Sequence, residues 1–352
     1  MSTPRRCPIS ARACTTALLF LLAACGGGDS GPSGPPNGPA GTLDVLFASP
    51  TPAELASVTD DWDTRTFPAV DVHVDATENV TVGTTPETVR TISDLVGTTR
   101  HSGLVLAPDG AADGTLPVIV YAHAGFLGVS RDELVTFASR FPDPSQFVFV
   151  APSFATTVEE RHLWDEDVDV SLAFLASALQ EEPEADGTRV GVIGFTEGAT
   201  MALLMAERST AISRVVEFSG MTNFFTSTIR GEFTQLLSGQ QPAFFISAVL
   251  NAAFVLPLQG GELTAEQTRL RLIRSSPALF VDRLPLVQIH HGANDDVVPV
   301  DQATSLVGAL TRAGRTSPDD FQALIDLSGG HDPANLEGSL DAAVAFLGEL
   351  AE

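Results

Sequence analysis

The chain has 352 residues, of which 44 are Asp or Glu and 19 are Lys or Arg, so its formal net charge is −25 at pH 7. This strong negative charge argues against binding to nucleic acid or to anionic lipid surfaces through charge. A chain of this length can build one large hydrophobic core or two smaller ones.

The N-terminal 24 residues have the order of features that an export signal shows. Arginines at positions 5, 6 and 12 make its start positive, and Ala17–Ala24 is an apolar segment too short to span a bilayer. Because the signal holds three arginines and no acidic residue, its removal would leave a charge of −25 − 3 = −28. An ordinary cleaved signal peptide is one interpretation.

A lipid anchor is the other interpretation of this N-terminus, and the one we favour. The signal ends in Leu22-Ala23-Ala24-Cys25, which resembles the lipobox of bacterial lipoproteins. The resemblance implies that Cys25 is lipidated and that the domain is exported and held at the outer membrane, since glycine and not aspartate follows Cys25. Residues 25–41, mostly Gly, Pro, Ser, Asn and Asp, are predicted to be a flexible tether.

Residues 42–352 are expected to form the folded domain. The other two cysteines lie in the signal, so this domain is expected to hold no disulfide and no thiolate metal site. Residues 42–61 are expected to pack along its surface. Alternating patterns predict short edge strands at 70–74 and 80–82, and then two strands, 103–107 and 117–121, joined by a turn.

From residue 118 onward, predicted strands and helices alternate. The strands are expected at 118–121, 147–151, 189–193, 214–218, 286–290 and 322–327, and the helices at 131–141, 166–180, 302–313 and 335–350. Such alternation predicts an α/β fold with a mostly parallel central sheet and helices on both faces. Ligands of such sheets bind beyond the carboxyl ends of the strands.

The stretch Arg189–Arg208 has the sequence of a nucleophile elbow. The apolar strand Arg189–Ile193 is followed by the turn Gly194-Phe195-Thr196-Glu197-Gly198 and then by an Ala- and Leu-rich helix. This context predicts that Thr196 is the nucleophile, at the N-terminus of a helix whose dipole favours a developing oxyanion. The backbone N–H of Glu197 is then one oxyanion donor.

An apolar insertion at about 222–275 interrupts the alternation. Within it, Ala243–Leu256 has only Ser247 and Asn251 as polar residues and is too short for a membrane span. A buried helix and an apolar lid over a substrate pocket are both open interpretations.

The acid and the base of a catalytic triad are predicted after later strands. Asp295 follows the strand at 286–290 within His291-Gly292-Ala293-Asn294-Asp295-Asp296-Val297-Val298-Pro299, and Asp296 is the fallback. His331 follows the last strand after a Gly-Gly pair that lets the loop fold back over the elbow. The order nucleophile, acid, histidine is that of the hydrolases built on such sheets.

The second oxyanion donor is expected in the loop His123-Ala124-Gly125-Phe126, from the N–H of Gly125 or Phe126, with His123 supporting the loop. Together these stretches resemble the α/β-hydrolase superfamily, nearest to the dienelactone hydrolase and prolyl oligopeptidase-like group. The resemblance implies an α/β-hydrolase fold and a small-molecule ester or acyl substrate. It implies no metal and no other cofactor, and the chain has no GxGxxG, P-loop or HExxH pattern.

Threonine at the elbow departs from the serine that this superfamily uses. A β-branched residue is strained at positive φ, and its methyl crowds the oxyanion site. We expect a carboxylesterase in which Thr196 forms an acyl-enzyme, with His331 as the base and Asp295 as the acid that orients it. The alternatives are a pseudo-hydrolase that only binds a ligand or partner, a peptidase of the prolyl oligopeptidase type, and an envelope lipoprotein with no ligand and no apolar pocket beside Thr196.

Overall fold

The fold is described from a computed structural model for residues 39–66, 68, 70–125, 128–154, 165–241 and 245–352. Residues 1–38, with Cys25 and the segment predicted to be a signal peptide, lie outside these ranges. The first element, helix α1 (Pro39–Leu46), begins inside the stretch predicted to be a tether. It does so because Leu43 and Leu46 are buried in the core of the domain.

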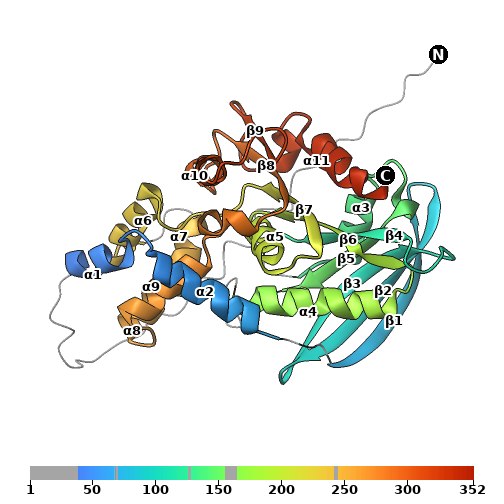
Figure 1. Ribbon diagram of the computed structural model, residues 1–352, viewed down its shortest axis with the longest axis horizontal. Helices are drawn as coiled ribbons and strands as arrows, with labels where there is room; N and C mark the ends of the chain where they lie inside the picture. Colours follow the sequence, from blue (N-terminus) through green and yellow to red (C-terminus); the bar gives the residue numbers. More distant parts are fainter. Residues whose placement is uncertain (1–38, 67, 69, 126–127, 155–164, 242–244) are drawn as a thin grey trace, which may run out of the picture. The chain divides into compact units, whose positions relative to one another are not determined.

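A nine-stranded sheet forms the centre of the domain, in the order β1-β2-β3-β5-β4-β6-β7-β8-β9 (Figure 1). The pairs β1–β2, β2–β3 and β3–β5 are antiparallel, and every later pair is parallel. The strands are β1 (Val70–Val82), β2 (Thr85–Val96), β3 (Thr99–Pro108), β4 (Leu116–Ala122), β5 (Val148–Ser153), β6 (Ala185–Phe195), β7 (Ile212–Phe218), β8 (Leu286–Gly292) and β9 (Phe321–Asp326). The mostly parallel sheet that the sequence predicts is therefore confirmed.

Two details of the antiparallel end differ from the prediction. Residues 70–82 form one continuous edge strand, and the sequence pattern did not indicate β2. Strands β3 and β4 are joined by a turn, but β5 lies between them in the sheet. The reason is that β4 and β5 are parallel, so the chain crosses over through α3 (Arg131–Ala138) and inserts β5 against β3.

Helices cover both faces of the sheet because the central strands alternate their side chains between two cores. Val118 and Val120 of β4 pack into the core that contains α4 (Glu166–Glu181), α5 (Glu197–Arg208) and α10 (Asp301–Arg312). Ile119 and Tyr121 pack into the opposite core, with α3 and α11 (Ser339–Gly348). The sheet is thus buried on both sides, as expected for parallel strands.

The insertion between β7 and β8 is helical. It consists of α6 (Ser227–Leu237), α7 (Phe245–Leu250), a π-helical turn (Asn251–Val255), α8 (Leu256–Gly260) and α9 (Ala265–Arg274). Within the apolar stretch Ala243–Leu256, Ile246, Val249 and Phe254 are buried in the main core, whereas Leu256 is 54% exposed. Its described part therefore packs largely as a buried helix.

An arginine of the insertion holds the N-terminal helices in place. Arg269 of α9 is buried, and its Nη1 donates to the carbonyl oxygens of Leu46 and Ala48 at 2.9 and 2.7 Å. Its Nε donates to the carboxylate of Glu54 at 2.6 Å, in α2 (Pro52–Thr64). The segment predicted only to lie on the surface is thereby fixed to the insertion.

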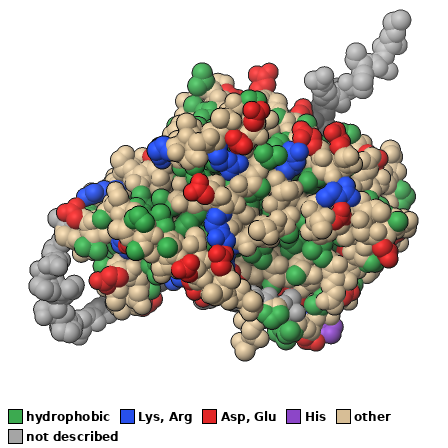
Figure 2. Space-filling view, viewed as in Figure 1, with side chains coloured by type: hydrophobic (Ala, Val, Ile, Leu, Met, Phe, Trp, Pro, Cys, Tyr) green, Lys and Arg blue, Asp and Glu red, His purple; other side chains and the backbone are tan. Residues whose placement is uncertain are grey.

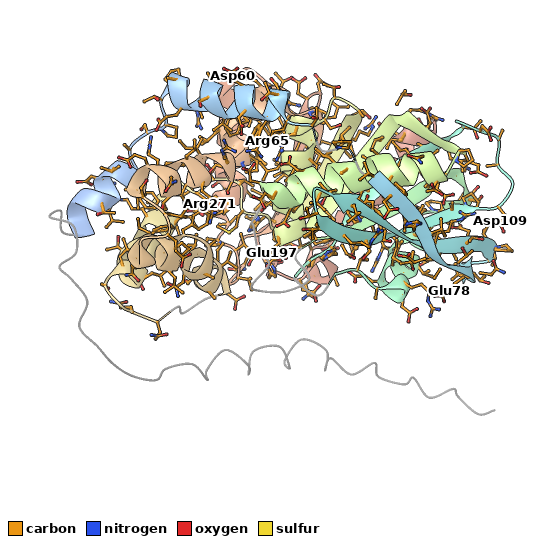
Figure 3. All side chains as sticks on the ribbon, turned by 90° about the horizontal axis from the view of Figure 1, so that it is seen from below. Asp60, Arg65, Glu78, Asp109, Glu197 and Arg271 are labelled. Carbon is orange, nitrogen blue, oxygen red and sulfur yellow. The ribbon has the colours of Figure 1, made fainter. Side chains whose placement is uncertain are left out.

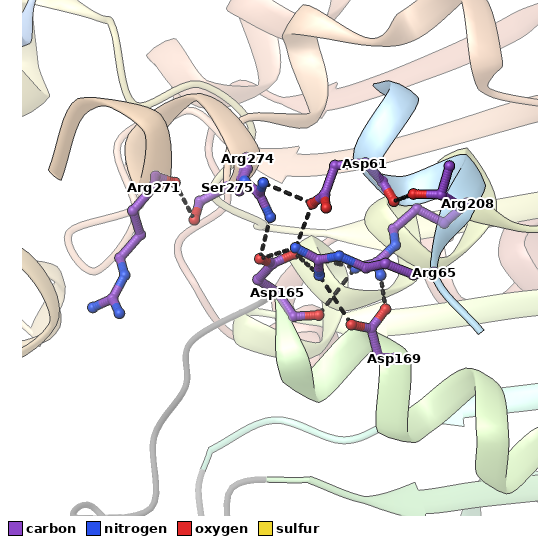
Figure 4. A network of polar contacts seen from close by, with 9 residues as sticks. Asp61, Arg65, Asp165, Asp169, Arg208, Arg271, Arg274 and Ser275 are labelled. Atoms are coloured by element: carbon purple, nitrogen blue, oxygen red, sulfur yellow. Dashed lines mark hydrogen bonds and ion pairs between the residues drawn. The ribbon is translucent and has the colours of Figure 1, made fainter. Parts of the chain in front are cut away.

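A second polar cluster joins four helices away from the elbow (Figure 4). Arg65, which caps α2, donates to Asp165 and Asp169 at the start of α4, at 2.8 and 3.0 Å. Arg274 at the end of α9 donates to Asp165 at 2.7 Å, and Arg208 at the end of α5 pairs with Asp169. Burial raises the pKa of Asp165, but Arg65 and Arg274 outweigh it and hold the pKa below its usual value. The charges are therefore compensated, which a buried ion cluster requires.

Candidate active site

The turn between β6 and α5 is built on close backbone contacts. A Cβ atom on Gly194 would lie 1.9 Å from the Gly198 carbonyl oxygen, and one on Gly198 would lie 2.1 Å from the Ala122 carbonyl oxygen. Only glycine fits at either position. Thr196 between them has φ 55° and ψ −108°, and its N–H donates to the Phe218 carbonyl oxygen at 2.8 Å. The turn thus has the strained geometry predicted for the elbow.

The three residues predicted to form the triad are brought together from separate elements. Thr196 Oγ1 lies 2.9 Å from Nε2 of His331, and Nδ1 of His331 lies 2.8 Å from Oδ2 of Asp295. Because Nδ1 faces a carboxylate, it carries the proton, and Nε2 is left to accept the proton of the threonine hydroxyl. This arrangement can move a proton away from Oγ1.

Asp295 is held as a carboxylate by its surroundings. Its side chain has no exposed surface, and its Oδ1 accepts the N–H groups of Val297 and Val298 at 2.9 and 2.8 Å. Burial raises the pKa of this carboxyl, but the bonds from His331 and the Val298 N–H outweigh it and lower the pKa. The ionised form can therefore orient His331 and stabilise an imidazolium.

The other buried histidines support the loops around this site. His123 stacks on Phe154 with ring centroids 4.0 Å apart, and burial lowers its pKa. His290 stacks on Phe218, and burial lowers its pKa to about 3. His291 Nε2 lies 2.9 Å from the Val298 carbonyl oxygen, in the loop that carries Asp295. His162 lies outside the described residues.

Two of the residues predicted to supply oxyanion donors, Glu197 and Gly125, are joined by a hydrogen bond. Glu197 is the first residue of α5, which places its N–H at the helix N-terminus. Gly125, at φ 74°, donates its N–H to Oε2 of Glu197 at 3.1 Å. Phe126 lies outside the described residues. The sequence analysis assigned Glu197 only a backbone role, and no local pattern indicates that its side chain reaches a loop 72 residues away.

A buried acid beneath the elbow was also not anticipated. Glu217 on β7 has no exposed surface, and its Oε2 accepts the N–H of Gly220 at 2.9 Å. Burial raises its pKa to about 8. The available signal was a glutamate between the apolar residues Val216 and Phe218 of a predicted strand.

A cavity of about 220 Å³ lies against the Asp295 loop. Thr228, Ile229 and Glu232 of α6 and Ile246 of α7 form one wall, and residues 295–297 and 299 form the other. Thr196 is not among its lining residues. The insertion therefore borders a largely apolar cavity next to Asp295, the acid of the predicted triad.

The described residues show neither a metal-binding cluster nor a membrane-spanning helix. Over the described ranges, no three His, Cys, Asp or Glu side chains are grouped so that they could hold a metal ion. In the same part of the chain, no helix is long and apolar enough to cross a membrane. On the face drawn in Figure 2, arginine side chains lie scattered among acidic ones and form no single basic patch.

Comparison with known proteins identifies the fold. Residues 105–254, which include the elbow but not Asp295 or His331, match the dienelactone hydrolase family. No curated protein matches the sequence. The structure is similar to acetyl xylan esterase 1 from Thermoanaerobacterium sp. JW/SL YS485, with a TM-score of 0.61 and 16% identity, over 90% of this chain and 99% of the esterase.

Two further similarities belong to an esterase and a peptidase. The acetyl xylan esterase from Paenibacillus sp. R4 matches with a TM-score of 0.59 and 13% identity, over 89% of this chain and 99% of that one. A puromycin-hydrolysing peptidase from Mycobacterium tuberculosis matches with a TM-score of 0.54 and 19% identity, over 76% of this chain and 44% of the peptidase. The chain thus has the α/β-hydrolase fold and spans less than half of the peptidase.

The buried carboxyl group of Glu217 predicts that the free energy of unfolding depends on pH. The folded state keeps Glu217 protonated up to a pKa of about 8, whereas the unfolded chain ionises it near 4.5. The stabilisation from protonated Glu217 is therefore complete below pH 4.5 and is lost as the pH rises toward 8. Glu217→Gln keeps an acceptor for Gly220 and removes the ionisation. We expect it to increase the free energy of unfolding by a few kcal/mol at about pH 8 and by much less at about pH 5.

Urea unfolding followed by circular dichroism measures this difference. Glu262→Gln removes an exposed carboxyl group and serves as the matched control, for which we expect little change at either pH. A destabilised Glu217→Gln variant at the higher pH, or an equal gain at both pH values, would contradict the prediction.

Proposed function

We propose that the protein hydrolyses carboxylic esters through an acyl-enzyme formed on Thr196. The observation that carries the proposal is the unbroken chain of contacts from Thr196 Oγ1 to His331 and on to Asp295, at 2.9 and 2.8 Å. The match to the dienelactone hydrolase family and the similarity to acetyl xylan esterases over almost their whole length support an ester substrate.

In this mechanism, Oγ1 of Thr196 attacks the ester carbonyl carbon while Nε2 of His331 takes the hydroxyl proton. Asp295 stabilises the imidazolium that forms, and the N–H groups of Glu197 and of the loop at Gly125 bind the oxyanion. His331 then gives the proton to the leaving alcohol. A water molecule, deprotonated by the same nitrogen, releases the acid and restores Thr196.

The conformation of Thr196 favours a nucleophilic role over a binding-only domain. A β-branched residue at φ 55° carries a strain of about 1–3 kcal/mol, which persists only where its surroundings enforce it. Here the glycine contacts and the bond to Phe218 enforce it, and the hydroxyl still points to His331. The methyl group lies on the same carbon, so we infer a slower reaction than serine would give.

Amide hydrolysis is a second candidate, because the puromycin-hydrolysing peptidase has a similar structure. The same proton path through His331 could protonate an amine leaving group. We prefer the ester because the similarity to the esterases extends over 99% of their length, whereas the chain spans 44% of the peptidase.

We also propose that the domain is exported and anchored by a lipid on Cys25. The support is the order of arginines, apolar residues and Leu-Ala-Ala-Cys in the sequence. In bacteria that express the whole chain, we expect the protein to sediment with membranes through a high-salt wash and to incorporate an alkyne-labelled fatty acid. Cys25→Ala should abolish both, and unlabelled wild-type protein in the soluble fraction would refute the anchor.

Substitution at Thr196 tests the proposed reaction. Thr196→Ala should remove p-nitrophenyl acetate hydrolysis, because it deletes Oγ1, the atom that contacts Nε2 of His331. Thr196→Ser should raise kcat about tenfold, because strain and crowding of the oxyanion site decrease. The initial rate of p-nitrophenolate release measures both, and a p-nitroanilide substrate assayed in parallel separates esterase from peptidase activity.

The matched control is Thr200→Ser in the same helix, where Oγ1 accepts the Met221 N–H at 3.0 Å and takes no part in the proton path. We expect it to leave kcat unchanged. Wild-type activity that survives in Thr196→Ala would exclude Thr196 as the nucleophile. A silent wild type with an active Thr196→Ser would favour the binding-only alternative.

A further inference from the structure

The carboxylate of Glu197 accepts a hydrogen bond from the Gly125 N–H, one of the two groups that the proposed mechanism uses to bind the oxyanion. Oε2 of Glu197 accepts the N–H of Gly125 at 3.1 Å, and the Glu197 side chain is 6% exposed. Glu197 is labelled in Figure 3, which draws the described side chains on the ribbon. The carboxylate therefore joins the two segments that supply the predicted donors, the start of α5 and the loop after β4.

An oxyanion bound by the Gly125 N–H would have to lie where Oε2 of Glu197 now accepts the hydrogen bond. Oxyanion donors act at about 2.7–3.1 Å from the oxygen that they stabilise, which is the distance at which Gly125 already holds Oε2. Two negative oxygens at one N–H repel each other, and burial strengthens the repulsion because little water screens it. The bound carboxylate is thus a competitor of the transition state.

The position of Glu197 favours an anion. Glu197 is in the first turn of a 12-residue helix, where the dipole favours an anion. The same field is what the transition state would use. In the free protein, the helix dipole and the Gly125 N–H therefore stabilise the Glu197 carboxylate, whereas in the reaction they would stabilise the oxyanion.

We propose that the Glu197 carboxylate occupies the oxyanion site of the unliganded protein and slows acyl transfer until it is displaced or protonated. The proposal rests on the esterase mechanism inferred above. Glu197 is then a residue that limits the rate through its charge, in addition to the backbone role of its N–H. A purely structural side chain, which only positions Gly125, would need the hydrogen bond and not the charge.

Glu197→Gln separates the two roles, because it keeps the size and an oxygen that can accept the Gly125 N–H but removes the charge. We expect kcat for p-nitrophenyl acetate to rise about tenfold at about pH 8. The ratio of variant to wild-type kcat should approach one as the pH falls, because protonation removes the same charge from the wild type.

The matched control is Asp132→Asn, which removes an exposed carboxylate from the first turn of α3. It changes the net charge equally, and we expect an unchanged kcat. A Glu197→Gln variant with kcat equal to or below that of the wild type at the higher pH would overturn the proposal. Such a result would leave Thr196-dependent hydrolysis, and hence the proposed function, intact.

Binding of benzeneboronic acid tests the proposal without turnover. Oγ1 of Thr196 adds to the boron atom and its proton passes to His331, which gives a tetrahedral boronate anion with one of its B–OH oxygens near the N–H donors. By calorimetry at about pH 8, Glu197→Gln should bind this acid about tenfold more tightly than the wild type, and Thr196→Ala should not bind it. Binding of the acid with equal affinity by the wild type and Glu197→Gln would contradict the proposal and leave the Thr196 mechanism intact. No binding by either protein would overturn the Thr196 mechanism and, with it, the proposal that rests on it.

Discussion

The close approach of β6 and α5 at the elbow is the constraint on which the rest of the site depends. The backbone of Gly198 lies against that of Ala122, and the backbone of Gly194 lies against that of Gly198, with no room for a side chain at either glycine. The chain can reverse there only if residue 196 takes a positive φ, which lifts its side chain above the carboxyl edge of the sheet. Strands β8 and β9, parallel to β6, end at the same edge, and their loops bring Asp295 and His331 to Thr196.

Three carboxyl groups lie around this turn, and each has different hydrogen-bond partners that give it a different role. Asp295 accepts two backbone N–H groups and faces His331, so its pKa is lowered although it is buried. Among the described residues, Glu217 accepts the N–H of Gly220 alone. It lies under the elbow, so burial dominates and its pKa is raised. Glu197 lies at the helix N-terminus, on the N–H of Gly125. Residues of one chemical class can thus orient a base, remain neutral or compete with an oxyanion, according to the hydrogen bonds that surround them.

Much of the fold could be predicted from the sequence because the parallel strands are buried on both faces. Strand β4 and the second half of β6, from Val190 onward, are runs of apolar residues and glycine. The order of such strands along the chain fixes a mostly parallel sheet. Strand β2 was missed because it carries Glu87, Arg90 and Asp94 within its length. Arg90 pairs with Glu182 of a distant segment, and such a partner cannot be identified from local pattern. The contact between Glu197 and Gly125 could not be predicted for the same reason.

Chemical labelling of the intact chain tests the central claim most directly, namely that the hydroxyl of Thr196 is an activated nucleophile. A fluorophosphonate ester reacts with such an oxygen by forming an O–P bond as fluoride leaves. After incubation and proteolysis, mass spectrometry should place a single phosphonyl group on the peptide that contains Thr196, and none on that peptide when His331 is replaced by Ala. A protein that stays unlabelled, or carries the label on another residue, would contradict the account.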